Sequence, residues 1–345
     1  MATQSLIFIT GGTGFIGSHV VHDTLKAGHR ARLTVRKVAQ IDELKSRFTL
    51  YASQLEFVVI SDITDTAALR AGLSDDVQYI FHLASPMPGK GDDFKTEYLQ
   101  PAVKGTEAIL EAAAAAPSVK KTVIISSLLA LIPLGALQTP GLHIQEGDNT
   151  SITVNPDMPF PSGPAGNGPK YSASKILAHR ATVEWMSKHK PHFSLVTVHP
   201  TFVLGYDYTQ KDASSPSGIN AYLLQSLTAP PGGKPIIPGS FVDVRDVSLV
   251  MLRSLGLEGG DWGKPLTEVL VAGRATTWQE VVDIVRERYP SVEVALQGPF
   301  AAPFTADTSR AERQLGVAWR STQELISSVF DQQMELRARA GRAGL

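Results

Sequence analysis

Two residues with interdependent chemistry, a tyrosine and a lysine, lie four positions apart at Tyr171 and Lys175. A helix predicted over residues 171–189 begins with them, and this spacing places both side chains on one helix face. A phenol has a reference pKa of about 10, and a neighbouring ammonium favours the phenolate and lowers that pKa. We therefore expect Lys175 to tune Tyr171, so that the phenol can donate a proton to a carbonyl oxygen of a substrate.

A second hydroxyl is needed to orient that oxygen and to stabilise its developing charge. Ser126 and Ser127 close an apolar run at residues 122–126, which is predicted to be a buried strand. The carboxyl ends of the strands form the edge at which an open α/β sheet binds its ligands. We expect one of these serines to lie beside Tyr171.

A glycine-rich loop joins an apolar strand, predicted at residues 5–10, to an amphipathic helix at residues 15–27. The loop runs from Gly11 to Gly17 and has glycines at positions 11, 14 and 17. Such a loop lets the backbone approach a pyrophosphate, and the helix packs closely on the strand. The N-terminus of the helix offers free N–H groups and a positive dipole end to the phosphates. The sequence therefore predicts a dinucleotide site.

The residues that follow the second predicted strand, at 32–35, indicate which dinucleotide binds. NAD-binding proteins carry an acidic residue there that accepts a hydrogen bond from the ribose 2′-hydroxyl. Here the chain has Arg36 and Lys37, and the first acidic residue is Asp42. A guanidinium forms bidentate hydrogen bonds with a phosphate, and the lysine adds charge. We therefore predict NADP(H) rather than NAD(H).

The remaining pattern predicts an α/β protein: a Rossmann-type doubly wound parallel sheet with a smaller C-terminal substrate lobe. Residues 1–200 are expected to form mainly the NADP-binding domain and residues 201–345 mainly the substrate-binding lobe, interleaved and without a clean linker. The segment 133–169 is rich in proline and glycine and is predicted to be a functional loop. Further strands are expected at 55–60, 77–84 and 193–199, and further helices at 92–116, 243–255, 277–289 and 321–340.

Composition excludes several classes of function. The chain has 345 residues, 43% of them hydrophobic, and a formal net charge of -1, which gives no electrostatic footprint for nucleic acid or an anionic membrane. It has no cysteine, so disulfides, thiolate nucleophiles and cysteine-ligated metals are excluded. The N-terminus lacks the features of a signal peptide and no apolar stretch is long enough to span a bilayer, so we expect a cytoplasmic protein.

Taken in order, the motifs resemble those of extended short-chain dehydrogenases/reductases. The similarity is to the branch that contains dihydroflavonol reductase, cinnamoyl-CoA reductase and yeast-type methylglyoxal (carbonyl) reductases, and it covers nearly the whole chain. The matching pieces are Gly11–Gly17, Thr34–Arg36, Phe81–Met87, Ile125–Ser127, Tyr171–Lys175, His199–Thr201 and Asp243–Val247. The resemblance implies NADPH-dependent reduction of an aldehyde or ketone.

The resemblance also assigns roles to residues. It implies a catalytic set of Ser127, Tyr171 and Lys175. It implies contacts with the cofactor from Gly11, Thr13, Gly14, Phe15, Ile16, Gly17, Arg36, Lys37, Asp62, Ile63, Leu83, Ala84, Ser85, Tyr171, Lys175, Pro200 and Val203. The expected substrate contacts are Met87, Ser127, Met158, Phe160, Tyr171 and Phe202. Of these, we expect Met87, Met158, Phe160 and Phe202 to form an apolar wall for an apolar carbonyl compound.

Departures from the family pattern concern the substrate. Ile125 stands where the family usually has threonine, Leu128–Ile132 is more apolar than usual, and residues 133–169 match nothing familiar. His199 is expected to pack near the cofactor. His19 and His22 could share a metal on one helix face, but no third ligand is evident, so we expect surface histidines and no metal.

Three alternative functions remain to be weighed. An NAD-dependent epimerase or dehydratase of a nucleotide sugar has the same Tyr/Lys pair, although Arg36 disfavours it. A 3β-hydroxysteroid-type dehydrogenase would run the reaction in the oxidative direction. A non-enzymatic NADP-binding redox sensor usually lacks the full Ser/Tyr/Lys set. The sequence leaves both a monomer and a homodimer open.

Overall fold

A computed structural model describes residues 4–85, 91–147, 152–216, 218–230, 232–257 and 266–343. The chain divides into two compact units, and each of them is built from three segments of the sequence. The first unit consists of Met1–Gly135, Glu146–His199 and Ser248–Val269. The second unit consists of Ala136–Gln145, Pro200–Val247 and Leu270–Leu345.

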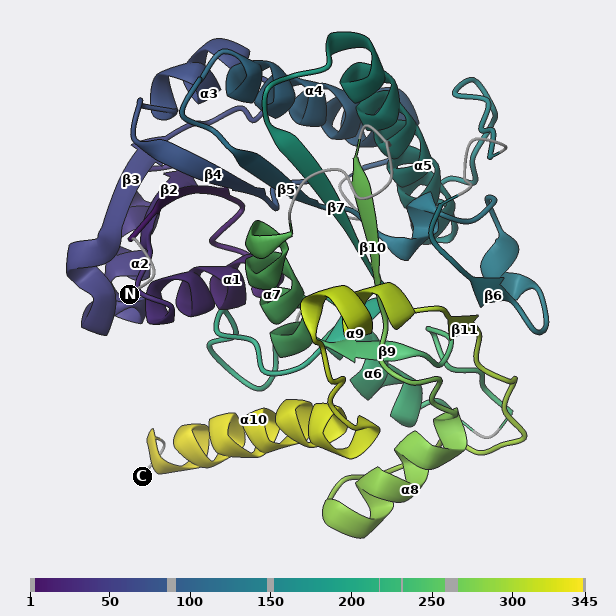
Figure 1. Cartoon of the computed structure of the whole chain (residues 1–345). Helices are drawn as coiled ribbons and strands as arrows, with labels where there is room; N and C mark the ends of the chain where they lie inside the picture. Colours follow the sequence, from purple (N-terminus) through teal and green to yellow (C-terminus); the bar gives the residue numbers. More distant parts are fainter. Residues whose placement is uncertain are drawn as a thin grey trace. The chain divides into compact units, whose positions relative to one another are not determined.

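The first unit is organised around a seven-stranded sheet with the strand order β10-β7-β5-β4-β1-β2-β3 (Figure 1). Each neighbouring pair from β3 across to β7 is parallel. This confirms the predicted Rossmann-type fold, although the strand at the β10 edge was not predicted. The strands are β1 (Leu6–Thr10), β2 (Arg30–Val35), β3 (Leu55–Val59), β4 (Val77–His82), β5 (Lys121–Ile125), β7 (Ser194–Pro200) and β10 (Thr267–Val271).

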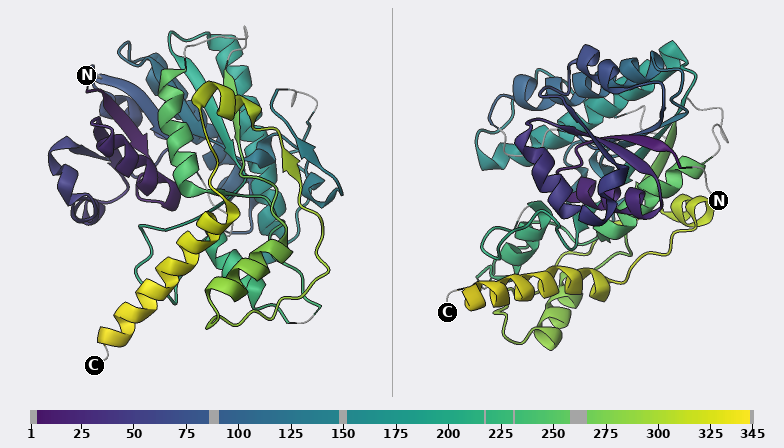
Figure 2. Two further views of the ribbon diagram at one scale, coloured as in Figure 1. Left: turned by 60° about the horizontal axis from the view of Figure 1, so that its bottom comes forward. Right: turned by 90° about the vertical axis from the view of Figure 1, so that its left-hand side faces the viewer.

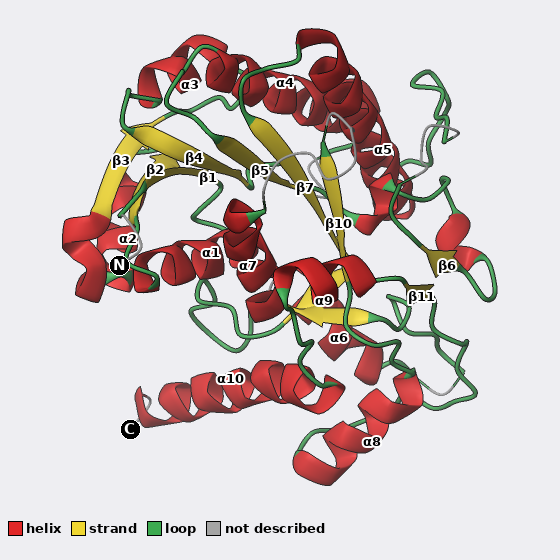
Figure 3. Cartoon of the chain, in the orientation of Figure 1, coloured by secondary structure: helices red, strands yellow, loops and turns green. Residues whose placement is uncertain are grey.

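Helices cover both faces of this sheet, as the doubly wound prediction requires. One face carries α3 (Thr66–Gly72), α4 (Gln100–Ala114) and α5 (Pro164–His189); the other carries α1 (Phe15–Lys26) (Figures 1 and 3). A further helix, α2 (Ala39–Arg47), follows β2. Sheet and helices enclose an apolar core that includes Phe8, Ile80, Ile109, Leu110 and Trp185. Burial of this apolar surface is the main force that holds the sheet and its helices together.

The helix α5 begins at Pro164, so the expected start at Tyr171 was wrong. Pro169 lies inside the helix, where a proline removes one backbone hydrogen bond. Contacts with the side chain of Asp92 compensate at this end of the helix. Its Oδ1 accepts hydrogen bonds from the Gly163 backbone at 2.8 Å and from Lys170 Nζ at 3.1 Å. The first turns of α5 therefore form in spite of their proline and glycine content.

A short π-helix at Lys95–Leu99 leads directly into α4. Pro101 lies in the first turn of α4, where its missing N–H has no helical partner in any case. The expected single helix over 92–116 is therefore a short π-helix followed by α4, and the change between them falls between Leu99 and Gln100, just before Pro101. Tyr98, in the π-helix, is fully buried and its hydroxyl donates to Asn167 of α5.

The second unit has its own core and two small sheets. Short parallel strands pair β8 (Phe202–Leu204) with β9 (Phe241–Asp243), and β6 (His143–Ile144) with β11 (Thr305–Ala306). The helices are α6 (Gly218–Leu227), α8 (Trp278–Arg288), α9 (Ser309–Leu315), α10 (Thr322–Ala343) and the start of α7 (Val244–Arg253). The apolar face of α10 packs beside α8 around Trp278, Val329 and Phe330 (Figure 2).

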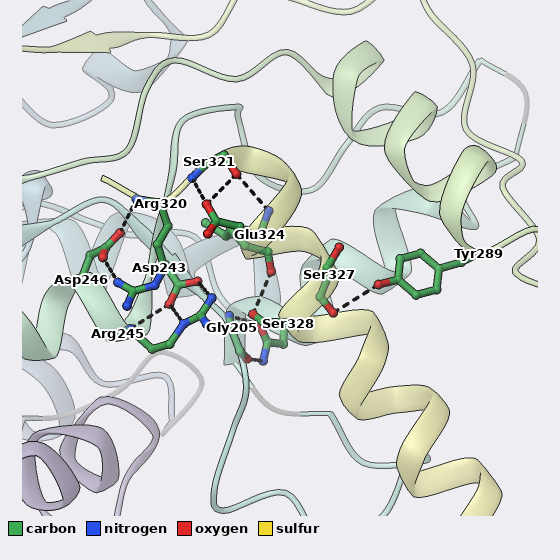
Figure 4. Close-up of polar contacts among 12 residues, drawn as sticks. Gly205, Asp243, Arg245, Asp246, Tyr289, Arg320, Ser321, Glu324, Ser327 and Ser328 are labelled. Carbon is green, nitrogen blue, oxygen red and sulfur yellow. Dashed lines mark hydrogen bonds and ion pairs between the residues drawn. The ribbon is translucent and has the colours of Figure 1, made fainter. Parts of the chain in front are cut away.

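Two buried aspartates of the second unit hold its polar interior together (Figure 4). Asp243 pairs with Arg245, with 2.6 Å between Oδ2 and Nη2. Asp246 accepts a hydrogen bond from the backbone of Arg320 at 3.0 Å and forms an ion pair with its side chain. Arg320 comes just before α10, so this pair fixes the start of the helix. The motif Asp243–Val247 therefore has a structural role within this unit.

Candidate active site

The glycine loop after β1 has the tight geometry that the sequence predicted. Gly11 has φ +75°, and a Cβ on it would lie 2.6 Å from the backbone nitrogen of Ala84. A Cβ on Gly17 would overlap the carbonyl oxygen of Gly11, so helix and loop can approach only because both residues are glycines. Gly14 is the N-cap of α1 and no side chain caps that helix. The loop therefore packs closely against the start of α1, and the N-terminus of that helix has no side-chain cap, as a pyrophosphate site requires.

Two exposed cations follow β2. The side-chain oxygen of Gln40 accepts hydrogen bonds from the backbone nitrogens of Arg36 at 2.9 Å and Lys37 at 3.1 Å, which fixes the turn. Within the described part of the chain, neither side chain forms an ion pair, so both charges remain available to a ligand. The geometry fits a phosphate on the adenosine ribose.

The ends of β3 and β4 carry the next predicted contacts. Asp62 is exposed, and its Oδ1 accepts hydrogen bonds from the backbone and hydroxyl of Thr64, which hold the pKa of its carboxyl below the usual value. After β4, Thr10 Oγ1 accepts from the backbone of Ala84 at 3.2 Å and also bonds His82 Nδ1 at 3.0 Å. Ile63, Leu83 and Ser85 complete these two turns, which both lie at the carboxyl ends of their strands.

The structure brings Ser127, Tyr171 and Lys175 together in the first unit. Ser127 follows β5 in an extended conformation, and its Oγ accepts a hydrogen bond from the Leu129 backbone at 3.2 Å. The Ser127 side chain is also near enough to Tyr171 to act on the pKa of the phenol. Lys175 Nζ lies 5.4 Å from the centre of the Tyr171 ring and donates to Ser85 Oγ at 2.8 Å. The set thus links the ends of β4 and β5 through one face of α5.

Burial dominates the electrostatics of this set. Desolvation raises the pKa of Tyr171 to about 12, although the hydrogen bond with Ser127 lowers it in part. Desolvation lowers the pKa of Lys175 to about 8. The expectation that Lys175 would bring the tyrosine pKa down is therefore wrong for this structure, because burial of the phenol outweighs the nearby charge. At neutral pH Tyr171 is a protonated phenol, which is the form that can donate a proton.

An apolar cluster surrounds the tyrosine face of α5. Met158 and Phe160, both predicted substrate contacts, pack against it, and the rings of Phe160 and Phe94 lie 4.5 Å apart. Sequence reasoning missed Phe94, although its spacing of four from Tyr98 was a detectable helical signal. The other members that sequence reasoning missed are Tyr98, Leu99, Leu134, Ile152, Val154, Ala173, Ile176 and Leu177.

Some predicted site residues lie elsewhere. Met87 falls outside the described residues. Pro200 ends β7, while Phe202 and Val203 lie in β8 of the second unit. His19 is buried with its ring against Phe15, so the expected surface position was wrong. The described residues contain no group of three histidines and acids that could hold a metal, and none of their helices is long and apolar enough to cross a membrane.

Known proteins resemble this chain over almost its entire length. The model of the NAD dependent epimerase/dehydratase family matches residues 7–260. The chain belongs to this family. Ketoreductase sphI of Aspergillus fumigatus is 36% identical over 340 residues, which cover 96% of this chain and 98% of the relative. Aldehyde reductase 2 of Sporidiobolus salmonicolor is 31% identical over 346 residues, which cover 94% and 95%.

The fold of this family member also matches solved structures. Yeast methylglyoxal/isovaleraldehyde reductase Gre2, solved in complex with NADPH, superposes with a TM-score of 0.82 at 23% identity. The match covers 97% of this chain and 99% of the other. Together these findings confirm the resemblance to extended short-chain dehydrogenases/reductases of the methylglyoxal reductase branch.

Proposed function

We propose that the protein reduces an aldehyde or ketone to an alcohol, with NADPH as the hydride donor. The observation that carries the proposal is the grouping of Ser127, Tyr171 and Lys175 at the carboxyl edge of the sheet, with the Lys175 ammonium over the tyrosine ring. Full-length similarity to a ketoreductase and an aldehyde reductase supports a small carbonyl substrate. The first unit would then bind most of the cofactor, and the second would be mainly the substrate-binding lobe.

The residues at the strand ends would hold the cofactor. The exposed Arg36 and Lys37 suit a 2′-phosphate, and the NADPH bound in the Gre2 structure agrees with this choice. When bound, NADPH supplies the hydride that the carbonyl carbon receives. We assign the pyrophosphate to Gly11, Thr13, Gly14, Phe15, Ile16 and Gly17, the adenine to Asp62 and Ile63, the riboses to Leu83, Ala84, Ser85, Tyr171 and Lys175, and the nicotinamide to Pro200 and Val203.

The proton chemistry belongs to the side chains of the chain itself. Tyr171 Oη donates its proton to the carbonyl oxygen, which becomes the hydroxyl of the product. Ser127 Oγ holds that oxygen and stabilises the charge that develops on it. The Lys175 ammonium, over the tyrosine ring, stabilises the phenolate that remains after the transfer. The phenolate then recovers a proton from solvent before the next turnover.

The surroundings of Tyr171 favour an apolar substrate. Met158 and Phe160 belong to the apolar cluster around α5, whereas Phe202 packs against the core of the second unit and Met87 lies outside the described residues, so the last two stay predicted substrate contacts. An aliphatic or aromatic ketone would remove apolar surface from water here, whereas a polyanion would leave its charges unpaired.

The first test is a direct comparison of NADPH and NADH affinity, followed by a panel of apolar ketones and aldehydes. Strong NADPH preference together with ketone-dependent NADPH oxidation would support the proposal. Preference for NAD(H), or NAD that copurifies tightly, would favour a nucleotide-sugar epimerase or dehydratase instead. NADP binding without turnover of any carbonyl or alcohol would favour a redox sensor, and alcohol oxidation alone would favour a hydroxysteroid-type dehydrogenase.

Cytoplasmic location and a monomeric or dimeric state stay predictions. Cell fractionation can test the location, and size-exclusion chromatography can test the oligomeric state.

A further inference from the structure

A third polar side chain continues the row formed by Tyr171 and Lys175 on α5. His179 lies four residues beyond Lys175, and this spacing places all three on one helix face. The proposed reaction uses the first two and leaves His179 without a role. His179 is nevertheless 4% exposed, and a buried imidazole needs polar partners.

A buried glutamate supplies one such partner. His179 Nε2 lies 2.8 Å from Oε1 of Glu268, which belongs to β10 and is 8% exposed. The other carboxylate oxygen accepts a hydrogen bond from the backbone of Gly147 at 2.9 Å. The His179–Glu268 pair thus joins α5 to the edge of the sheet. All of these residues belong to the first unit.

Next to this pair lies His199, which reaches the candidate catalytic serine. Its ring stands edge-on to the ring of His179, with 4.8 Å between the centroids. His199 Nδ1 lies 3.0 Å from the carbonyl oxygen of Ser127, and Nε2 lies 2.9 Å from Thr197 Oγ1. A carbonyl oxygen can only accept, so Nδ1 must carry the hydrogen.

His199 is also held neutral. Complete burial, together with the nearby His179, lowers its pKa to about 3, although the charge of Glu268 opposes this shift in part. A neutral imidazole with its hydrogen on Nδ1 has a free lone pair on Nε2, which accepts from the Thr197 hydroxyl. One tautomer therefore satisfies both ring nitrogens at once. Because the Ser127 carbonyl has no proton to pass on, this arrangement is suited to positioning and does not form a proton relay.

The anchored carbonyl controls the direction of the Ser127 side chain. That oxygen accepts a second hydrogen bond, from the Ala130 backbone at 3.0 Å, so both of its lone pairs are used. The preceding residue is bound to β7 as well, through the 2.7 Å bond from Ser126 nitrogen to the Val198 carbonyl. Together these bonds fix the peptide plane from which Ser127 Oγ extends toward Tyr171.

We propose that His199, supported by the His179–Glu268 pair, is a positioning residue that orients Ser127 for carbonyl reduction. The inference rests on the proposed function, because it assigns His199 to the reaction of that same serine. His199 touches no reacting atom and acts through the backbone of Ser127. The histidine that precedes Pro200 in the sequence thereby gains a specific role.

Nitrogen NMR of the protein labelled with ¹⁵N-histidine tests the arrangement without relying on turnover. We expect His199 to remain neutral, with its hydrogen on Nδ1, across the neutral pH range. The His199→Asn variant assigns its signals by their disappearance. A hydrogen on Nε2, or a charged ring at neutral pH, would overturn the inference whether or not any carbonyl substrate is turned over.

Variants at His199 test the consequence for catalysis. His199→Leu removes the donor to Ser127 and should lower kcat by about 10- to 100-fold, the effect of a small misplacement of a reacting group. His199→Asn should restore much of the loss, because its amide nitrogen can take the place of Nδ1. NADPH affinity should change little in either variant. The matched control is His192→Leu at an exposed histidine of the same unit, which should keep wild-type kcat.

The outcomes separate the inference from the proposed function. Wild-type kcat in His199→Leu, or equal losses in the leucine and asparagine variants, would overturn the positioning role while carbonyl reduction stands. A loss that lies entirely in NADPH affinity would overturn it as well. If the wild type reduces no carbonyl compound, the proposed function fails first, and the NMR result still decides whether His199 anchors Ser127.

Discussion

The ammonium of Lys175 lies over the face of the Tyr171 ring, with Nζ 5.4 Å from its centroid. A cation in this position is attracted by the electrons of the ring. The hydrogen bond that Lys175 donates goes to Ser85 at 2.8 Å. We infer that the lysine acts on the tyrosine through its charge, while Ser127 is the hydroxyl that acts on the pKa of the phenol.

Removal of the Tyr171 hydroxyl should abolish proton transfer to the substrate and leave NADPH binding nearly unchanged. Tyr171→Phe removes the proposed proton donor and should lower kcat by about 10²- to 10⁴-fold, the usual contribution of a general acid. NADPH affinity, measured by fluorescence titration, should stay within a few-fold of wild type. Tyr208→Phe, at an exposed tyrosine of the second unit, is the matched control and should keep full activity. Retained turnover in Tyr171→Phe would remove this residue from the mechanism.

The charge of Lys175 should set the alkaline limit of activity. Its pKa is lowered to about 8 by burial, so the ammonium is present below that pH and is lost as the pH rises through it. The value of kcat/KM for NADPH, which reports on groups of the free enzyme, should therefore decline above about pH 8. Lys175→Arg should move the decline to higher pH, because a guanidinium keeps its charge. A wild-type profile that stays flat well above this pH would contradict the assignment.

Arg36 should decide between the two dinucleotides. Arg36→Ala removes hydrogen bonds to a charged phosphate, each worth about 1.5–3 kcal/mol, and should weaken NADPH binding by roughly tenfold to 100-fold. NADH lacks the 2′-phosphate, so its affinity should hardly change. Calorimetric titration with both cofactors measures the difference. Arg70→Ala, at an exposed arginine of α3, controls for loss of surface charge. Equal weakening for both cofactors would show that Arg36 is structural.

Two glycines of the first unit should respond differently to alanine. A Cβ on Gly17 would overlap the Gly11 carbonyl oxygen, so Gly17→Ala must displace α1 from the loop and should weaken NADPH binding about tenfold or more. Gly168 lies inside α5 with open space around it. Gly168→Ala should leave cofactor affinity unchanged and change stability by less than about 1 kcal/mol, because the helix preference of alanine is opposed by crowding between its Cβ and the ring of Pro169. Thermal unfolding and NADPH titration of both variants test this contrast, and wild-type affinity in Gly17→Ala would contradict it.

Local signals predicted most of the sheet and the Ser/Tyr/Lys set. The alternation of strands and helices, the glycine loop and the spacing from Tyr171 to Lys175 are all readable within short windows of sequence. The start of α5 could not be predicted in this way, because a proline such as Pro169 normally indicates the end of a helix. What supports the helix there is the long-range contact of Asp92 with Gly163 and Lys170.

The polar network behind Ser127 was equally hidden from the sequence. Glu268 lies in β10, a strand that was not predicted. Glutamates are rarely buried, so the sequence alone gives no reason to place this one in the interior. His179 and His199 are 20 residues apart in the chain, and nothing in their spacing indicates that their rings meet. The pKa of Tyr171 also depends on the burial of the phenol, which only the folded structure reveals.

The threading of the chain has a consequence for how such enzymes can be recombined. Each unit is assembled from three separate stretches, and β10 itself begins in the first unit and ends in the second. Consider a chimaera that takes residues 1–199 from one enzyme and the rest from another. Its first unit would receive Ser248–Val269, which includes part of an edge strand of the main sheet, from the second enzyme. Grafting a new substrate specificity onto this scaffold therefore requires three coordinated insertions, or point changes within the existing framework.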